Sequence, residues 1–141
     1  MKIMISGSMA FAKEMLQTKS QLEKRGYEVG LPFETEVHID KPKFVDDLSG
    51  NLQYCIDNDV IRKSFDFIVN ADAILVLNHP RKGIKGYIGT STLMEIAIAY
   101  YSHKKIFLLN RIPHYDDVRW AHEITIMQPI VLDGNLENIV L

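Results

Sequence analysis

Glu95 is the residue of this chain whose surroundings most clearly suggest chemistry. It is the one charged side chain in the stretch 87–101, and its neighbours Leu93, Met94 and Ile96 are apolar. A carboxylate among apolar side chains loses hydration, and hydrogen bonds or a functional use must offset that cost. Such a group can act as a nucleophile toward an electrophilic carbon.

Two interpretations of Glu95 follow from its place after a hydroxyl-rich turn. If Thr92 is the N-cap of a helix, Thr92-x-x-Glu95 is a capping box in which each side chain satisfies the backbone N–H of the other residue. The same geometry would hold a nucleophilic carboxylate at the mouth of a pocket, beside free N–H groups that accept an anionic or hydroxylated ligand. The two interpretations are compatible, and both stay open at this point.

The electrophile that best suits this arrangement is the anomeric carbon of a sugar. A carboxylate nucleophile forms a glycosyl-enzyme ester there, which water or a second acceptor then opens. The small and hydroxylated residues Gly89, Ser91 and Thr92 stand immediately before Glu95 and could contact such a substrate.

Other chemistries have little support in the sequence. The Walker pattern and the Gly-x-Gly-x-x-Gly fingerprint are absent, so neither an ATPase nor a nicotinamide enzyme is indicated. Ser8 follows a glycine but lacks the Gly-x-Ser-x-Gly frame of a nucleophile elbow. No histidine has metal-ligand spacing to a carboxylate or to another histidine. We therefore expect no metal and no cofactor. The histidines are His38, His79, His103, His114 and His122.

Composition favours a small cytoplasmic protein with one site. The 141 residues fit one domain over residues 1–141, and a net charge of −2 argues against nucleic acid or a membrane surface as the partner. A small-molecule ligand is the expectation. Cys55 is the one cysteine, which suits a reducing compartment, and no leader peptide or membrane span is visible in the sequence.

Strand and helix patterns alternate along the chain. Short apolar runs predict strands at 3–6, 27–31, 72–78, 105–110 and 129–132, while helical spacing is present at 9–25, 53–69 and 116–127 and after Thr92. Alternation of this kind predicts a parallel α/β sheet with right-handed crossovers. We expect a flavodoxin-like, Rossmann-like domain of three layers, with five strands in the order 2-1-3-4-5.

The carboxyl ends of the strands in such a sheet define where a ligand binds. The turn at residues 7–9, the loop 79–92 and the turn 110–113 follow strands one, three and four and should surround one crevice with Glu95 at its edge. Residues 32–52 lack periodicity, although 42–49 could form one or two helical turns, and this segment is predicted to cover the site. The loop 79–89 carries Arg81, Lys82 and Lys85, which indicates either a solvated basic loop or a loop that attracts anions.

Three segments resemble the nucleoside 2-deoxyribosyltransferase superfamily, and within it the 2′-deoxynucleoside 5′-phosphate N-hydrolase branch. They are residues 5–9 (ISGSM), 71–76 (ADAILV) and 89–100, which includes MEIAIA. The resemblance implies cleavage or transfer of an N-glycosidic bond in a (deoxy)nucleoside or its 5′-monophosphate, with Glu95 as nucleophile. It also implies a homodimer or higher homo-oligomer whose interface completes the pocket. The predicted substrate-binding residues are Gly7, Ser8, Met9, Asn78, Gly89, Ser91 and Thr92.

The chain departs from the pattern of the hydrolases at three positions. Ala10 stands where the hydrolases have an arginine that grips phosphate, and Met4 replaces a tyrosine. Ser64 stands at the position of the second carboxylate of the family, so Asp59 or Asp66 would have to take its role. Asp59 is the predicted second catalytic residue. One of the three basic residues of the loop 79–89 is a candidate for the missing phosphate contact.

Two other functions remain open from the sequence. In a nucleotide-binding sensor, Glu95 would cap its helix and hydrogen-bond a ribose, which the missing arginine, tyrosine and second carboxylate favour. A scaffolding domain would bind no nucleotide at all. Release of a free base separates the enzyme from the sensor, and stabilisation by a nucleotide separates the sensor from the scaffold.

Overall fold

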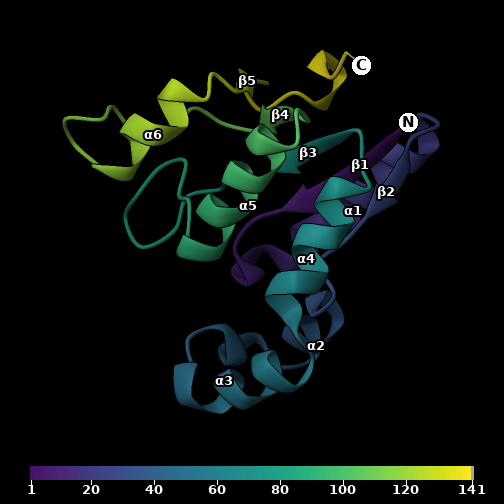
Figure 1. Cartoon of the computed structure of the whole chain (residues 1–141), viewed down its shortest axis with the longest axis vertical. Helices are drawn as coiled ribbons and strands as arrows, with labels where there is room; N and C mark the ends of the chain where they lie inside the picture. Colours follow the sequence, from purple (N-terminus) through teal and green to yellow (C-terminus); the bar gives the residue numbers. More distant parts are fainter. Residues whose placement is uncertain (141) are drawn as a thin grey trace.

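The computed structural model describes residues 1–140 and contains a five-stranded sheet in which every pair of neighbouring strands is parallel. The strand order is β2-β1-β3-β4-β5, which confirms the predicted doubly wound α/β fold (Figure 1). The strands are β1 (Lys2–Ser6), β2 (Glu28–Gly30), β3 (Ala73–Val76), β4 (Lys105–Leu108) and β5 (Ile130–Val131).

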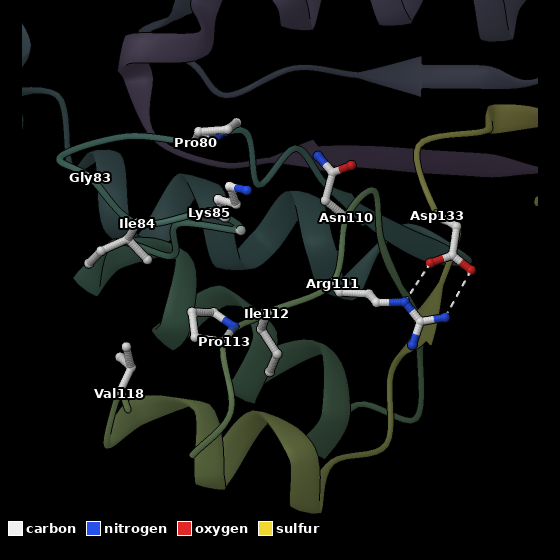
Figure 2. Close-up of a pocket in the computed structure, with 11 residues that line it drawn as sticks. Pro80, Gly83, Ile84, Lys85, Asn110, Arg111, Ile112, Pro113, Val118 and Asp133 are labelled. Carbon is white, nitrogen blue, oxygen red and sulfur yellow. Dashed lines mark hydrogen bonds and ion pairs between the residues drawn. The ribbon is translucent and has the colours of Figure 1, made fainter. Parts of the chain in front are cut away.

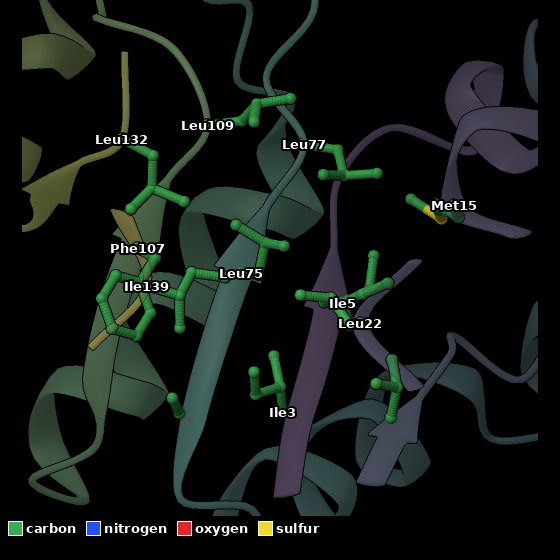
Figure 3. Packing of buried hydrophobic residues seen from close by; sticks show 12 residues of the cluster. Ile3, Ile5, Met15, Leu22, Leu75, Leu77, Phe107, Leu109, Leu132 and Ile139 are labelled. Carbon is green, nitrogen blue, oxygen red and sulfur yellow. The ribbon is translucent and has the colours of Figure 1, made fainter. Parts of the chain in front are cut away.

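Helices cover both faces of this sheet. Alternate side chains of a strand point to opposite faces, and both sets are apolar here, so each face needs a cover. Ile3 and Ile5 belong to a buried cluster that also contains Met15 and Leu22 of α1 (Ala12–Lys24), as Figure 3 shows. Met4, between them, belongs to the cluster of the other face. That second cluster takes side chains from α4 (Val60–Val69), α5 (Thr90–Tyr101) and α6 (Trp120–Ile126).

The segment predicted to cover the site is largely helical and contains more helix than the one or two turns expected at 42–49. After β2 the chain forms α2 (Thr35–Asp40), the 3-10 helix η2 (Pro42–Val45) and α3 (Leu48–Asp57). Figure 1 shows this segment at the bottom of the view, beyond the end of the sheet. No residue of α3 is buried, so the apolar side chains of this helix do not face the core.

The helix predicted over residues 53–69 is divided into α3 and α4. Asp59 separates them with φ 48° and ψ 47°, a left-handed conformation that aspartate tolerates better than most residues. This break turns α3 away from the axis of α4. The remaining short elements are the 3-10 helices η1 (Met9–Phe11) and η3 (Leu136–Asn138).

The start of α5 also differs from the prediction. Gly89 is the N-cap and Thr90 the first helical residue, so Glu95 lies in the second turn of the helix. The capping-box interpretation of Thr92 and Glu95 is therefore wrong, because an N3 partner must stand three residues after the cap. The carboxylate of Glu95 is left available for other partners.

Within residues 1–140, no helix combines the length and the apolar composition needed to cross a bilayer.

Candidate active site

The cavity that contains Glu95 lies at the point where the strand order reverses, between the carboxyl ends of β1 and β3. In doubly wound sheets this is where ligands bind. The cavity has a volume of about 450 Å³, which is within the range of small-molecule sites. Its walls come from the turn after β1, the start of α5, the segment 34–61 and the loop between β3 and α5.

Two serine hydroxyls hold the carboxylate of Glu95. Ser6, the last residue of β1, donates a hydrogen bond to Oε2, and Ser64 of α4 donates one to Oε1. Both serines are buried, and Glu95 itself is half-buried with access to the cavity. The arrangement fixes the orientation of the carboxylate and leaves each oxygen with acceptor capacity.

Burial raises the pKa of Glu95, and the hydrogen bonds from Ser6 and Ser64 oppose that rise because they favour the ionised form. The charge of Glu34 raises the pKa further, which places a second carboxylate in the same electrostatic environment. Glu95 thus combines partial desolvation with two oriented donors, which is the environment expected of a carboxylate nucleophile.

Glu34 is the second carboxyl group of this cavity. It occupies the N-cap position of α2, but its side chain makes no capping hydrogen bond to that helix. Burial raises the pKa of Glu34, and a hydrogen bond from its own backbone offsets part of the effect. Glu34 and Glu95 also line a small adjoining cavity of about 30 Å³, together with Ser64.

His38 and Cys55 form the wall beside Glu34. His38 is 7% exposed, its pKa is lowered by burial, and its Nδ1 atom is buried without a hydrogen-bond partner among the described residues. The ring of His38 lies 5.5 Å from that of Phe44, which in turn lies 5.8 Å from that of Tyr54. These aromatic contacts link α2, η2 and α3.

The turn after β1 brings backbone close to the cavity. Gly7 has φ +151°, and a Cβ atom there would lie 3.0 Å from the carbonyl oxygen of Leu77, so the position requires glycine. The hydroxyl of Ser8 accepts a hydrogen bond of 3.2 Å from the N–H of Ala10. Ser8 is thus the N-cap of η1, in agreement with a turn role and not with a nucleophile elbow.

Basic residues of the loop between β3 and α5 form the rim. Arg81 donates a hydrogen bond of 2.8 Å to Asp46, and Lys82 lies 3.9 Å from the same carboxylate. The guanidinium of Arg81 is also 5.6 Å from the ring centre of Tyr87. Two cations share one carboxylate, so the rim has a net positive charge. Lys85 lines a different cavity.

That second cavity is larger, with a volume of about 740 Å³, but it does not include Glu95 (Figure 2). It lies between the loop 80–86 and the turn 110–113, which the sequence had placed around the same crevice as Glu95. Its one carboxylate, Asp133, pairs with Arg111 at 2.8 and 3.3 Å. We place the candidate active site in the smaller cavity because Glu34 and Glu95, two carboxyl groups with raised pKa values, both line it.

Two predicted residues lie elsewhere than expected. Asp59 is exposed at the α3–α4 junction, where it pairs with Arg62 at 3.0 Å, and it is not part of the cavity lining. Asn78 is fully buried and joins the ends of β3 and β4 through hydrogen bonds with Asn110 at 2.7 and 2.8 Å. The other predicted site residues do line the Glu95 cavity: Gly7, Ser8, Met9, Gly89, Ser91 and Thr92.

The sequence did not single out Ser6, Glu34 or His38 as members of the site. Ser6 ends β1 and Glu34 follows the carboxyl end of β2, so the rule that loops meet at that edge of the sheet could have identified both. His38 had no signal of its own, because its burial depends on a helix that the pattern did not reveal.

Comparisons with known proteins give no family for this chain. No family model matches the sequence, and no curated protein matches it. Among solved structures, the chain is similar to the CMP N-glycosidase BcmB of Clostridium botulinum, at 19% identity and a TM-score of 0.43. That match covers 77% of this chain and 70% of the other, and a likeness at this level carries no inference about activity.

Proposed function

We propose that this protein cleaves or transfers the N-glycosidic bond of a (deoxy)nucleoside or nucleoside 5′-monophosphate through Glu95. The observation that carries the proposal is the carboxylate itself, which two buried serine hydroxyls orient at the switch point of the sheet, inside a cavity of ligand size. The family resemblance of the segments around Gly7 and Glu95 agrees with it.

In the proposed reaction, an oxygen of Glu95 bonds to the anomeric carbon while the bond from that carbon to the base nitrogen breaks. The electron pair of the broken bond leaves with the base, and a glycosyl ester of Glu95 remains. Attack by water on the same carbon releases the sugar, and attack by a second base gives transfer. The hydrogen bonds from Ser6 and Ser64 favour the ionised carboxylate and orient it toward the anomeric carbon during the first step.

The backbone around the cavity suits a sugar or sugar phosphate. The first N–H groups of α5 have no partner within the helix and belong to cavity-lining residues, Thr90, Ser91 and Thr92. The positive rim at Arg81 and Lys82 stands on the same cavity and would attract a 5′-phosphate.

Base release tests the proposal directly. The protein is incubated with a panel of ribo- and deoxyribonucleosides and their 5′-monophosphates, and free base is quantified by chromatography. We expect base from at least one member, and a methyl glycoside of retained configuration when methanol is added, because the reaction passes through a covalent ester. Stabilisation against melting by a nucleotide without base release would instead identify a nucleotide sensor.

Replacement of Arg81 by alanine is expected to raise KM for nucleoside 5′-monophosphates about tenfold, because one charge-assisted hydrogen bond to phosphate is lost. KM for the corresponding nucleosides should stay unchanged. Steady-state kinetics on each pair of substrates measures the effect. Lys85→Ala is the matched control, since Lys85 belongs to the same loop but lines the other cavity. An equal loss on nucleosides and monophosphates would refute the phosphate contact.

We also propose that the chain self-associates through α3. Leu48, Leu52 and Ile56 repeat at intervals of four residues and are 74%, 59% and 61% exposed, so they form one apolar stripe. Leu48 also lines the Glu95 cavity, and a second copy on this stripe would close the open side of the site.

Leu52→Glu is expected to convert the dimer into a monomer, because it places a charge in the centre of the proposed interface. Size-exclusion chromatography with light scattering measures the mass. Ile126→Glu, at an equally exposed apolar position on α6, is the control that should leave the mass unchanged. A parent protein that is monomeric at the same concentration would contradict the proposal.

A further inference from the structure

We propose that Glu34 is the general acid that protonates the departing base, an inference that rests on the proposed function. The reaction needs such a group because a nucleobase is a poor leaving group without a proton. The sequence offers no carboxylate at Ser64, where the resemblance would place one.

The position of Glu34 relative to Glu95 is the first argument. Glu34 follows β2 and starts α2, whereas Glu95 is in α5, and the fold brings the two side chains to the same pair of cavities. The smaller of these, about 30 Å³, is bounded by both side chains and is too small for a substrate. A sugar in the larger cavity would therefore meet two carboxyl groups, as glycoside-cleaving sites require.

The different surroundings of the two carboxyl groups assign their roles. Glu95 accepts hydrogen bonds from two hydroxyl groups, which favour its ionised form. No side chain among the described residues donates a hydrogen bond to Glu34, whose pKa burial raises. Because the charge of one carboxyl group opposes ionisation of the other, we assign the ionised form to Glu95, which has the two hydroxyl donors, and the proton to Glu34.

The other titratable groups around Glu34 do not change this assignment. Burial lowers the pKa of His38 and raises those of Tyr54 and Cys55, so all three are neutral near pH 7. Both cations that line the cavity, Arg81 and Lys82, lie at its rim with Asp46. Glu95 is the one other carboxyl group that lines both cavities with Glu34 among the described residues.

The remaining aspartates of this region are less suited to the role. Asp59 is exposed and paired with Arg62, and Asp46 is paired with Arg81. Asp66 is exposed on α4 and outside the cavity lining. Asp46 and Asp59 are thus engaged in ion pairs, and Glu34 has no such partner among the described residues.

The proton balance of the two steps is complete with these two residues. In the first step Glu34 gives its proton to the base as the base leaves, and becomes a carboxylate. In the second step that carboxylate takes a proton from water, the water oxygen bonds to the anomeric carbon, and the ester bond to Glu95 breaks. Glu34 ends protonated and Glu95 ionised, as at the start.

Glu34→Gln tests the role through the leaving group. On the nucleotide that the parent protein cleaves best, we expect kcat to fall about 10²- to 10⁴-fold. On a 4-nitrophenyl (deoxy)ribofuranoside 5-phosphate, whose phenolate leaves without a proton, formation of nitrophenolate in the pre-steady-state burst should fall less than about tenfold. The basic limb of the pH profile of kcat/KM should also disappear.

Glu36→Gln is the matched control, because Glu36 is an exposed residue of the same helix. Thermal melting checks that each variant folds. If Glu34→Gln does not fold, Glu34→Asp is used, which keeps a proton donor and should retain the basic limb with a lower kcat. An equal decrease in rate on the nucleotide and on the nitrophenyl substrate, or no decrease on either, would overturn the role of Glu34. The proposed function would still stand in that case. A parent protein that releases no base from any nucleotide would overturn the proposed function itself.

Discussion

Glu95→Gln is expected to lower kcat for base release about 10³-fold or more while the protein stays folded. Glutamine has the shape of glutamate but lacks the negative charge that attacks the anomeric carbon, so the ester intermediate cannot form. Its amide oxygen can accept the hydrogen bond from Ser6 or Ser64, and its amide group can donate to the other hydroxyl. Product chromatography measures the rate, and circular dichroism measures the fold.

The same variant should change how stability depends on pH. Burial raises the pKa of Glu95 above its ordinary value of 4.5, so the folded protein holds this proton at pH values where the unfolded chain has lost it. The free energy of unfolding therefore decreases as pH rises from about 4.5 through the folded pKa. In Glu95→Gln this titration is absent, so the free energy of unfolding should decrease less with pH. At pH 7 the variant should be at least as stable as the parent protein.

Urea denaturation at several pH values measures that difference. His38, whose lowered pKa makes stability rise with pH, is present in both proteins, so its contribution cancels in the comparison. Glu36→Gln should follow the parent at each pH, because Glu36 is exposed. A Glu95→Gln variant that keeps parental base release would exclude Glu95 as the nucleophile.

The parts of the fold that the sequence predicted are those that a single local pattern determines. The uninterrupted apolar runs 73–77 and 106–109 contain β3 and all of β4 except Lys105, and an asparagine follows each run. Their alternation with helices was enough to predict the parallel sheet and its order. Glu95 could be singled out for the same reason, since one charge inside an apolar helix is a local anomaly.

The parts that the sequence missed depend on contacts between distant segments. The two hydrogen bonds to Glu95 span 89 and 31 residues of sequence, and no spacing rule connects such positions. The left-handed residue Asp59 interrupts an apolar stripe that otherwise continues from Ile56 to Ile68, so the break between α3 and α4 was hidden. Glu34 was overlooked because α2 is six residues long and too short for a periodic signal.

The double variant Ser6→Ala with Ser64→Ala is expected to lower kcat/KM about 10- to 100-fold on the acidic limb of the pH profile and much less at higher pH. Each hydroxyl donates a hydrogen bond to the carboxylate of Glu95 and so favours its ionised form. Without these donors, burial acts unopposed, and the pKa of Glu95 rises further. The fraction of protein with an ionised nucleophile then falls at acidic pH and recovers as pH increases.

A pH profile of kcat/KM distinguishes this effect from a merely structural one. The acidic limb should move to higher pH in the double variant, and the basic limb, which we assign to Glu34, should keep its position. Ser102→Ala, at the C-cap of the same helix, is the control for loss of a hydroxyl from α5 and should leave both limbs in place. A uniform decrease at all pH values would mean that the serines position Glu95 without tuning its charge. Movement of the acidic limb alone would mean that the serines tune the charge of Glu95, since their hydrogen bonds to its carboxylate favour the ionised form.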